Sequence, residues 1–158
     1  MIAAETSATL TGVPYATSPA PFIPYEGLSG DVILESTWAI SPIRAVLELA
    51  SLPENWDGYG SPSISVEVVN QAIRLVLDVA RLGIDPLPEP FVGPTAGGGI
   101  ILEWNLGKRE LSLSVLPDGM VEHVKSDSGE PLEEGQATWA LLRELVSWLV
   151  GPTDPRAA

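Results

Sequence analysis

The segment 55–60, NWDGYG, carries the densest set of chemically capable side chains in the sequence. Asn55 and Asp57 can accept hydrogen bonds from nearby backbone amides, and glycine tolerates positive φ, so the pattern is typical of an ordered loop. One interpretation is a binding loop that offers Trp56 and Tyr59 to a protein or a sugar. The other is a structural crossover in which Asp57 holds the turn and Trp56 fills the core. The pattern is not an EF-hand, because alternating oxygen ligands and a closing glutamate are absent.

His123 is the only histidine, and a catalytic histidine needs an orienting acid and a nucleophile. One hypothesis is therefore a small hydrolase or carbohydrate-binding domain in which Asp57, Glu103 and His123 converge in one pocket. The hydroxyls nearby, such as Ser112, alternate with apolar positions, so a solvated strand face explains them without catalysis. The sequence predicts no catalytic residue.

Metal and cofactor sites are not predicted either. No compact ligand spacing joins His123 to carboxylates such as Asp118 or Glu122. The glycine run 97–99 lacks the preceding strand, the following helix and the Lys-Ser/Thr pair of a phosphate-binding loop. It predicts a flexible entry to a strand.

The charge balance restricts the class of partner. Eight basic and 21 acidic side chains give 8 − 21 = −13. Phosphate backbones and anionic lipids bind clustered Lys and Arg, so neither nucleic acid nor a membrane is expected as partner. A basic protein or cations suit this surface better.

A chain without cysteine has no disulfide, thiol nucleophile or thiolate zinc site. With no membrane helix and no signal peptide expected, the sequence predicts a cytoplasmic protein.

Helices are predicted from apolar residues spaced three and four apart, and strands from apolar residues that alternate. The expected helices cover 41–52, capped by Ser41, then 65–82, capped by Ser65, and 134–150. The expected strands cover 99–105, 109–116 and 120–125, and extended or polar connectors cover 84–94 and 126–135. This order predicts an α+β fold, in which a three-stranded antiparallel meander packs against about three helices.

Residues 1–30 differ from the rest in composition. They contain four prolines, two acids and no base, so they carry −2 and the remainder carries −11. Proline favours an extended, polyproline-like backbone, and Tyr15, Phe22 and Tyr25 provide apolar anchors. Two interpretations stay open: a loose tail, or an arm that packs on its own domain or on a neighbouring subunit. We therefore expect an arm at 1–30, one domain at 31–151 and a tail at 152–158.

Two of the five tryptophans lie outside the expected core stripes. Trp38 precedes the first helix, and Trp139 lies off the main stripe of the last helix. Exposed tryptophan is enriched at interface hot spots, so both are candidate contact residues. The alternative is that the N-terminal arm covers them.

An ordered combination of motifs runs along the chain: the 55–60 loop, Pro62 and a helix, the PEP element at 88–90, the stretch from Pro94 to Gly97 and Gly98, the strand 102–104 and the turn 117–119. In this combination the chain resembles a family of small bacterial and phage-borne proteins. The resemblance covers about residues 52–125. It implies a compact bacterial α+β domain. No activity is established for that family, so no catalytic residue is carried over.

Together these features predict a non-enzymatic protein-binding module, as an accessory, antitoxin-like or inhibitor subunit or as part of a larger bacterial or phage assembly. The partner is another protein or a second copy of the chain. The predicted contact residues are Tyr15, Phe22, Tyr25, Trp38, Trp56, Asp57, Tyr59 and Trp139. A further alternative is an acidic nucleic-acid mimic, which needs carboxylates spaced like phosphates on one face, whereas the acids here are spread along residues 26–154.

Overall fold

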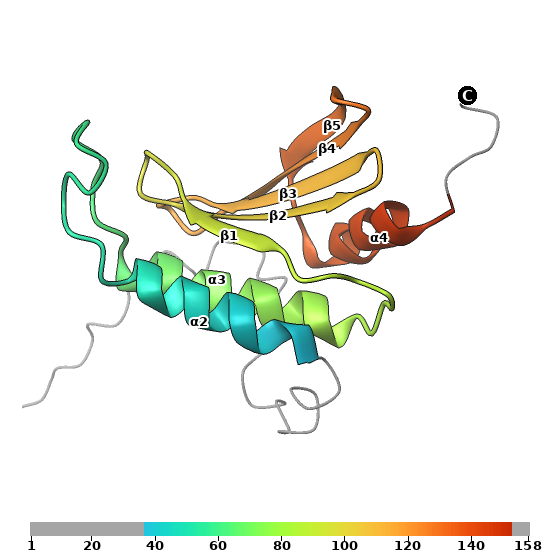
Figure 1. Cartoon of the computed structure of the whole chain (residues 1–158), viewed down its shortest axis with the longest axis horizontal. Helices are drawn as coiled ribbons and strands as arrows, with labels where there is room; N and C mark the ends of the chain where they lie inside the picture. Colours follow the sequence, from blue (N-terminus) through green and yellow to red (C-terminus); the bar gives the residue numbers. More distant parts are fainter. Residues whose placement is uncertain (1–36, 153–158) are drawn as a thin grey trace, which may run out of the picture.

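The computed structural model describes residues 37–152 (Figure 1). The predicted arm at 1–30, with Tyr15, Phe22 and Tyr25, and all of the predicted tail except Pro152 lie outside the described residues. The elements follow in the order η4 (Thr37–Ala39), α2 (Ile40–Leu49), α3 (Val66–Arg81), β1 (Phe91–Pro94), β2 (Ile100–Leu106), β3 (Arg109–Val115), β4 (Val121–Asp127), β5 (Glu130–Gln136) and α4 (Trp139–Val150).

The described strands form one antiparallel sheet in the order β1-β2-β3-β4-β5. The α+β class is confirmed, but the predicted three-stranded meander is wrong, because the sheet has five strands. The three predicted strands are the central ones, β2, β3 and β4. β2 and β3 alternate between buried and more exposed positions over most of their length, and β4 does so over its first residues, which is the pattern of a sheet with one covered face.

Both missed strands lie at the edges of the sheet. β1 is four residues long and ends in Pro94, and an edge strand tolerates proline because one row of its amides needs no partner. β5 replaces most of the polar loop predicted at 126–135. All seven of its residues are exposed, so it shows no apolar alternation. Ser128 and Gly129, with φ of 56° and 84°, make the tight turn before it.

The helix boundaries also differ from the prediction in part. α3 begins after Ser65 as predicted, and the Ser65 hydroxyl accepts a hydrogen bond from the Val68 amide at 3.3 Å. α2 begins at Ile40, so Ser41 lies inside the helix, and its hydroxyl bonds the Glu89 carboxylate instead of capping. α4 begins at Trp139 and not at 134, because β5 occupies the preceding residues and Thr138 caps the helix.

The described helices all lie on one side of the sheet. α2 and α3 run side by side beneath it, and α4 packs near its other end, against β3 (Figure 1). The core between these layers centres on Trp104 of β2, which is 1 % exposed. Its indole nitrogen donates a hydrogen bond to the Pro88 carbonyl at 2.9 Å, so the large ring is buried without an unpaired donor. No helix within residues 37–152 is long and apolar enough to cross a membrane.

Candidate functional site

The loop between α2 and α3 is held by its own hydrogen bonds. The Asn55 amide donates to the Ser61 carbonyl at 2.7 Å, and the Gly58 amide donates to the Asn55 carbonyl at 3.0 Å. The Asn55 side chain accepts from the Gly60 amide at 2.6 Å. Asn55 has φ of 61°, a left-handed conformation that asparagine tolerates better than most residues. The segment is therefore an ordered loop, as its composition predicts.

Asp57 is the centre of this loop. Its Oδ1 accepts hydrogen bonds from the amides of Tyr59 at 2.9 Å and Ser61 at 3.2 Å, and its Oδ2 accepts from the Ser61 hydroxyl at 2.5 Å. The Ser61 hydroxyl and then the Tyr59 amide lower the pKa of Asp57. A general acid or base works best with a pKa near neutral pH, so this carboxylate suits a structural role in the loop.

The two aromatic side chains of the loop lie in different surroundings. Trp56 is half-buried, and its Nε1 is buried without a hydrogen-bond partner in the described part of the chain. Tyr59 is 95 % exposed. In Figure 1 the loop rises from the end of α2 to the level of the sheet before it returns to α3. Asp57 holds the loop through its hydrogen bonds, whereas Trp56 is half-buried and Tyr59 is exposed.

The turn between β1 and β2 supports the base of this loop. A Cβ added to Gly98 would lie 3.1 Å from the Pro62 ring, so the two segments are in close contact. The turn is itself hydrogen-bonded, because the Thr95 hydroxyl accepts from the Gly99 amide and the Thr95 amide donates to the Gly99 carbonyl, both at 2.9 Å. The flexible strand entry predicted at 97–99 is therefore a hydrogen-bonded hairpin turn. A strand, β1, does precede it, but no helix follows.

The other predicted contact residues of the described chain pack against the core. Trp38 is half-buried and meets Trp104 edge to face, with ring centroids 6.4 Å apart. Trp139 is also half-buried against the core cluster. Neither ring stands free as Tyr59 does.

The residues of the hydrolase hypothesis do not converge. Glu103 pairs across strands with Ser112, on the face that carries no helix. His123 pairs with Leu113, on the covered face, and is 2 % exposed. Glu103 and His123 therefore point to opposite sides of one sheet. The orientation of His123 could have been predicted from the sequence. A tight turn at 117–119 sets the register of the hairpin, and this register places His123 opposite the apolar Leu113.

The partner of His123 comes from the unpredicted strand β5. Its Nε2 lies 3.3 Å from Glu133 Oε1, while Glu133 Oε2 bonds the Lys125 ammonium at 2.6 Å. Lys125 first, and then His123, lower the pKa of Glu133. The Nδ1 of His123 is buried with no hydrogen-bond partner among residues 37–152. No group of three metal-ligating side chains occurs in those residues.

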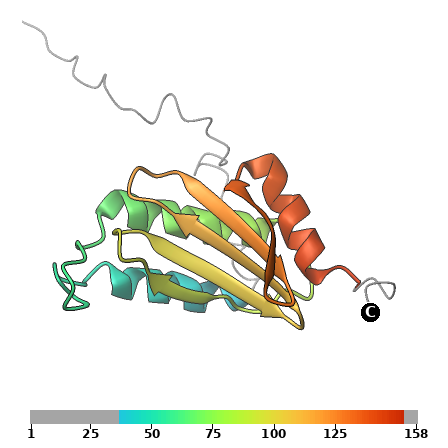
Figure 2. The same ribbon diagram turned by 90° about the horizontal axis from the view of Figure 1, so that it is seen from above.

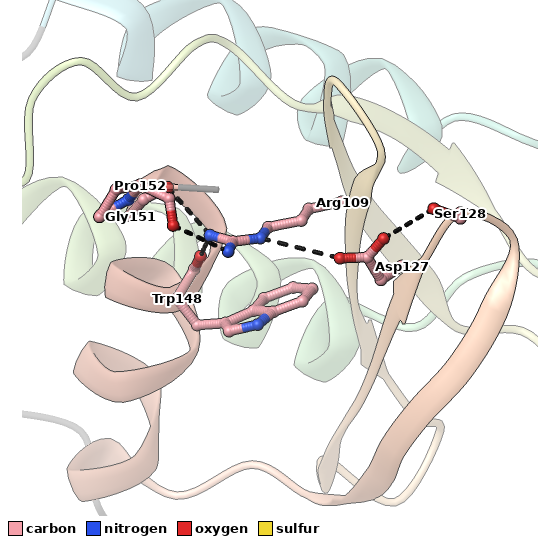
Figure 3. Close-up of polar contacts among 6 residues, drawn as sticks. All are labelled: Arg109, Asp127, Ser128, Trp148, Gly151 and Pro152. Carbon is pink, nitrogen blue, oxygen red and sulfur yellow. Dashed lines mark hydrogen bonds and ion pairs between the residues drawn. The ribbon is translucent and has the colours of Figure 1, made fainter. Parts of the chain in front are cut away.

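Arg109 joins β3 to the end of α4 (Figure 3). Its guanidinium donates hydrogen bonds to the carbonyls of Trp148 at 2.5 Å, Gly151 at 2.9 Å and Pro152 at 3.0 Å. These carbonyls belong to the unsatisfied end of the helix and the residues after it, so the arginine acts as a cap from outside the helix. Sequence reasoning missed this contact because 39 residues separate Arg109 from Trp148.

The face of the sheet opposite the helices is the second surface feature. Figure 2 looks onto it and shows no described helix lying over it. β2, β3, β4 and β5 each direct one glutamate outward there, which are Glu103, Glu110, Glu122 and Glu134. We call this surface the open face. Its serines were predicted as a solvated strand face, but its acidic character emerges only when the four strands are placed in register.

Comparisons with known proteins add no relative: no protein-family model matches the chain, and searches of curated proteins and of solved structures found no significant match. The resemblance drawn from the 55–60 loop and its neighbouring motifs stays a prediction.

Proposed function

We propose that this protein is a non-enzymatic protein-binding module that anchors its partner through Tyr59. The observation that carries the proposal is a 95 % exposed tyrosine on a loop in which Asn55 and Asp57 bond the backbone. Tyrosine offers a large amphipathic surface at low entropic cost, and it is enriched among interface hot spots. A loop already ordered in the free protein loses little further entropy on binding.

The polar side chains of the loop support binding over catalysis. Asp57 accepts three hydrogen bonds from within the loop, and its pKa is lowered, away from the range of a general base. The candidate acid and base of the hydrolase alternative lie on opposite sheet faces. The module would serve as an accessory, antitoxin-like or inhibitor subunit or as a component of a larger bacterial or phage assembly, with a protein partner or a second copy of the chain.

The test uses the full chain and two matched variants. Tyr59→Ala removes the exposed anchor, and Leu132→Ala truncates another exposed apolar residue, 55 % exposed, on the edge strand β5. Each protein is immobilised, exposed to lysate of the native host, and the bound proteins are identified by mass spectrometry. Light scattering measures self-association in parallel.

We expect a partner, or a dimer, that the wild type and Leu132→Ala retain alike and that Tyr59→Ala loses. A hot-spot tyrosine contributes about 2 kcal/mol to binding, so the affinity of the Tyr59→Ala variant for the partner should fall about 30-fold. The proposal is overturned if the wild type is monomeric and captures nothing, or if Tyr59→Ala binds its partner with unchanged affinity.

A further inference from the structure

The open face combines its side chains in ordered cross-strand rows. One row runs Phe91, Glu103, Ser112, Val124 and Glu134, and the next runs Gly93, Ile101, Ser114, Glu122 and Gln136. Small hydroxyl and aliphatic groups thus occupy the middle of the face, and carboxylates stand around them. Phe91, 61 % exposed, lies at the β1 end of the first row. The face is therefore a partly apolar surface with acidic groups on four neighbouring strands.

The basic side chains of the strands are confined to one face of the sheet. The only basic residues within its strands are Arg109 and Lys125, and both lie on the face toward the helices. There they pair with the acids of that face, since Lys125 bonds Glu133 and Arg109 lies 4.0 Å from Asp127. The four outward glutamates have no ion pair or side-chain hydrogen bond within the described chain. Their charges are therefore available to a partner.

The spacing of these carboxylates indicates whether a single metal ion or an extended polypeptide could bind them. Neighbouring strands lie about 4.8 Å apart, so the three intervals from Glu103 to Glu134 span about 14 Å at the backbone. A single metal ion draws its oxygen ligands to within about 2.6 Å, so it cannot use carboxylates spread over this distance. Lysines and arginines along a polypeptide surface can meet them individually.

We infer that the open face binds a protein surface rich in lysine and arginine, an inference that rests on the proposed protein-binding function and names the chemistry of the partner. Charge complementarity selects this occupant. The N-terminal residues 1–36 contain no Lys or Arg, so they offer the face no opposite charge. A second copy that presented the same face would repel it. The loop between α2 and α3 rises to the level of the sheet, so one extended partner can contact both the loop and the open face (Figure 1).

The experiment uses a defined probe, a fluorescein-labelled peptide of about twelve alternating lysines and serines, which is long enough to cross the strands. Its affinity for the full chain is measured by fluorescence anisotropy at low salt and at about 150 mM salt. The test variant is the triple substitution E103Q/E122Q/E134Q. The matched control is E48Q/E67Q/E144Q, which removes three exposed glutamates of the helices and changes the net charge by the same amount.

We expect the peptide to bind the wild type and the helix variant with affinities within about twofold, and the open-face variant at least about tenfold more weakly. Amide chemical shifts on peptide titration provide a second measurement. They should move at Ser112, Ser114 and Val124 and stay unchanged along α2 and α3.

Two results would overturn the inference. Equal weakening in both triple variants means that the peptide responds only to net charge, and shifts confined to the helices place the contact elsewhere. Comparing how Tyr59→Ala and the open-face variant bind the natural partner distinguishes a failure of this inference from a failure of the proposed function. If the open-face variant keeps the natural partner while Tyr59→Ala loses it, the binding function stands and the open face is not its surface.

Discussion

Arg109 holds Trp148 in two ways at once. Its Nη1 donates a 2.5 Å hydrogen bond to the Trp148 carbonyl, and its guanidinium carbon lies 5.3 Å from the centre of the Trp148 ring. Lys125 approaches the same ring to 5.2 Å. Two cations near one indole give favourable cation–π contacts, while the hydrogen bonds satisfy the end of α4. The contact therefore fastens the last helix to the start of β3.

Arg109→Ala should destabilise the protein by about 2–3 kcal/mol, because three carbonyls lose a charged donor and the indole loses one of its two neighbouring cations. Arg109→Lys should recover less than half of this loss, since an ammonium group does not reproduce the planar fork. Urea unfolding followed by tryptophan fluorescence measures both. The control is Lys108→Ala at the neighbouring exposed position, which should change stability by less than about 0.5 kcal/mol. Equal effects at the two positions would contradict a capping role for Arg109.

Asp57→Ala should loosen the loop without unfolding the domain. The substitution removes acceptors from the amides of Tyr59 and Ser61, so their hydrogen exchange should accelerate about fivefold to tenfold. Exchange at β3 amides such as Leu113 should stay unchanged. Because hydrogen bonding lowers the Asp57 pKa, its stabilising contribution is present above the ordinary pKa of 3.8 and is lost as the pH falls through the lower folded value. Exchange at Tyr59 and Ser61 that is identical in the variant and the wild type would show that Asp57 does not order the loop.

The central strands and the cap of α3 could be predicted because each depends on local pattern. Ser65 precedes an apolar helical stripe, and Leu111, Leu113 and Val115 alternate with polar residues. β1 and β5 could not be found in this way. β1 is short and ends in Pro94, and β5 is exposed along its whole length, so pairing with a neighbour, and not burial, makes each a strand.

The sequence predicts that residues 55–60 form an ordered loop, but not which of its side chains face the solvent. An ordered loop followed from Asn55, Asp57 and the glycines, but composition cannot say which of Trp56 and Tyr59 is buried. The exposure of each ring is set by tertiary packing, which composition does not specify. The base of the loop at Pro62, for example, packs on the hairpin turn at Gly98, a segment distant in sequence. The open face needed the register of four strands, because Glu103 and Glu134 come together only through two strands that lie between them.

His123→Leu should leave the stability of the fold within about 1 kcal/mol of the wild type. Leucine loses the 3.3 Å contact with Glu133, but it also removes a buried Nδ1 that has no partner in the described chain. Leu113→Ala, directly across the strand pair, provides the contrast and should cost about 2–5 kcal/mol, because it leaves a cavity in the core. Chemical denaturation measures both variants. A loss above about 3 kcal/mol in His123→Leu would mean that the polar contacts of the imidazole dominate its packing.

Asp78 should make stability fall as the pH rises. It lies on α3, 3 % exposed, with Oδ1 3.7 Å from Arg81 and Oδ2 without a hydrogen-bond partner among residues 37–152. Burial raises the pKa of Asp78 to about 7, against the opposing charges of Arg81 and Arg74. The native protein therefore keeps a proton that the unfolded chain, with a pKa of 3.8, releases. This contribution is fully present below pH 3.8 and is lost as the pH rises through about 7.

Asp78→Asn removes this titration while it keeps the size of the side chain. The shift from 3.8 to about 7 sets an upper limit of about 4 kcal/mol for the effect. We expect the variant to match the wild type at pH 4 and to be more stable by about 1–3 kcal/mol at pH 8. Urea unfolding at intervals between these values measures the difference. Glu67→Gln, an exposed acid on the same helix, should leave the wild-type profile intact. Parallel pH profiles for Asp78→Asn and the wild type would show that the Asp78 carboxyl titrates alike in the folded and unfolded states.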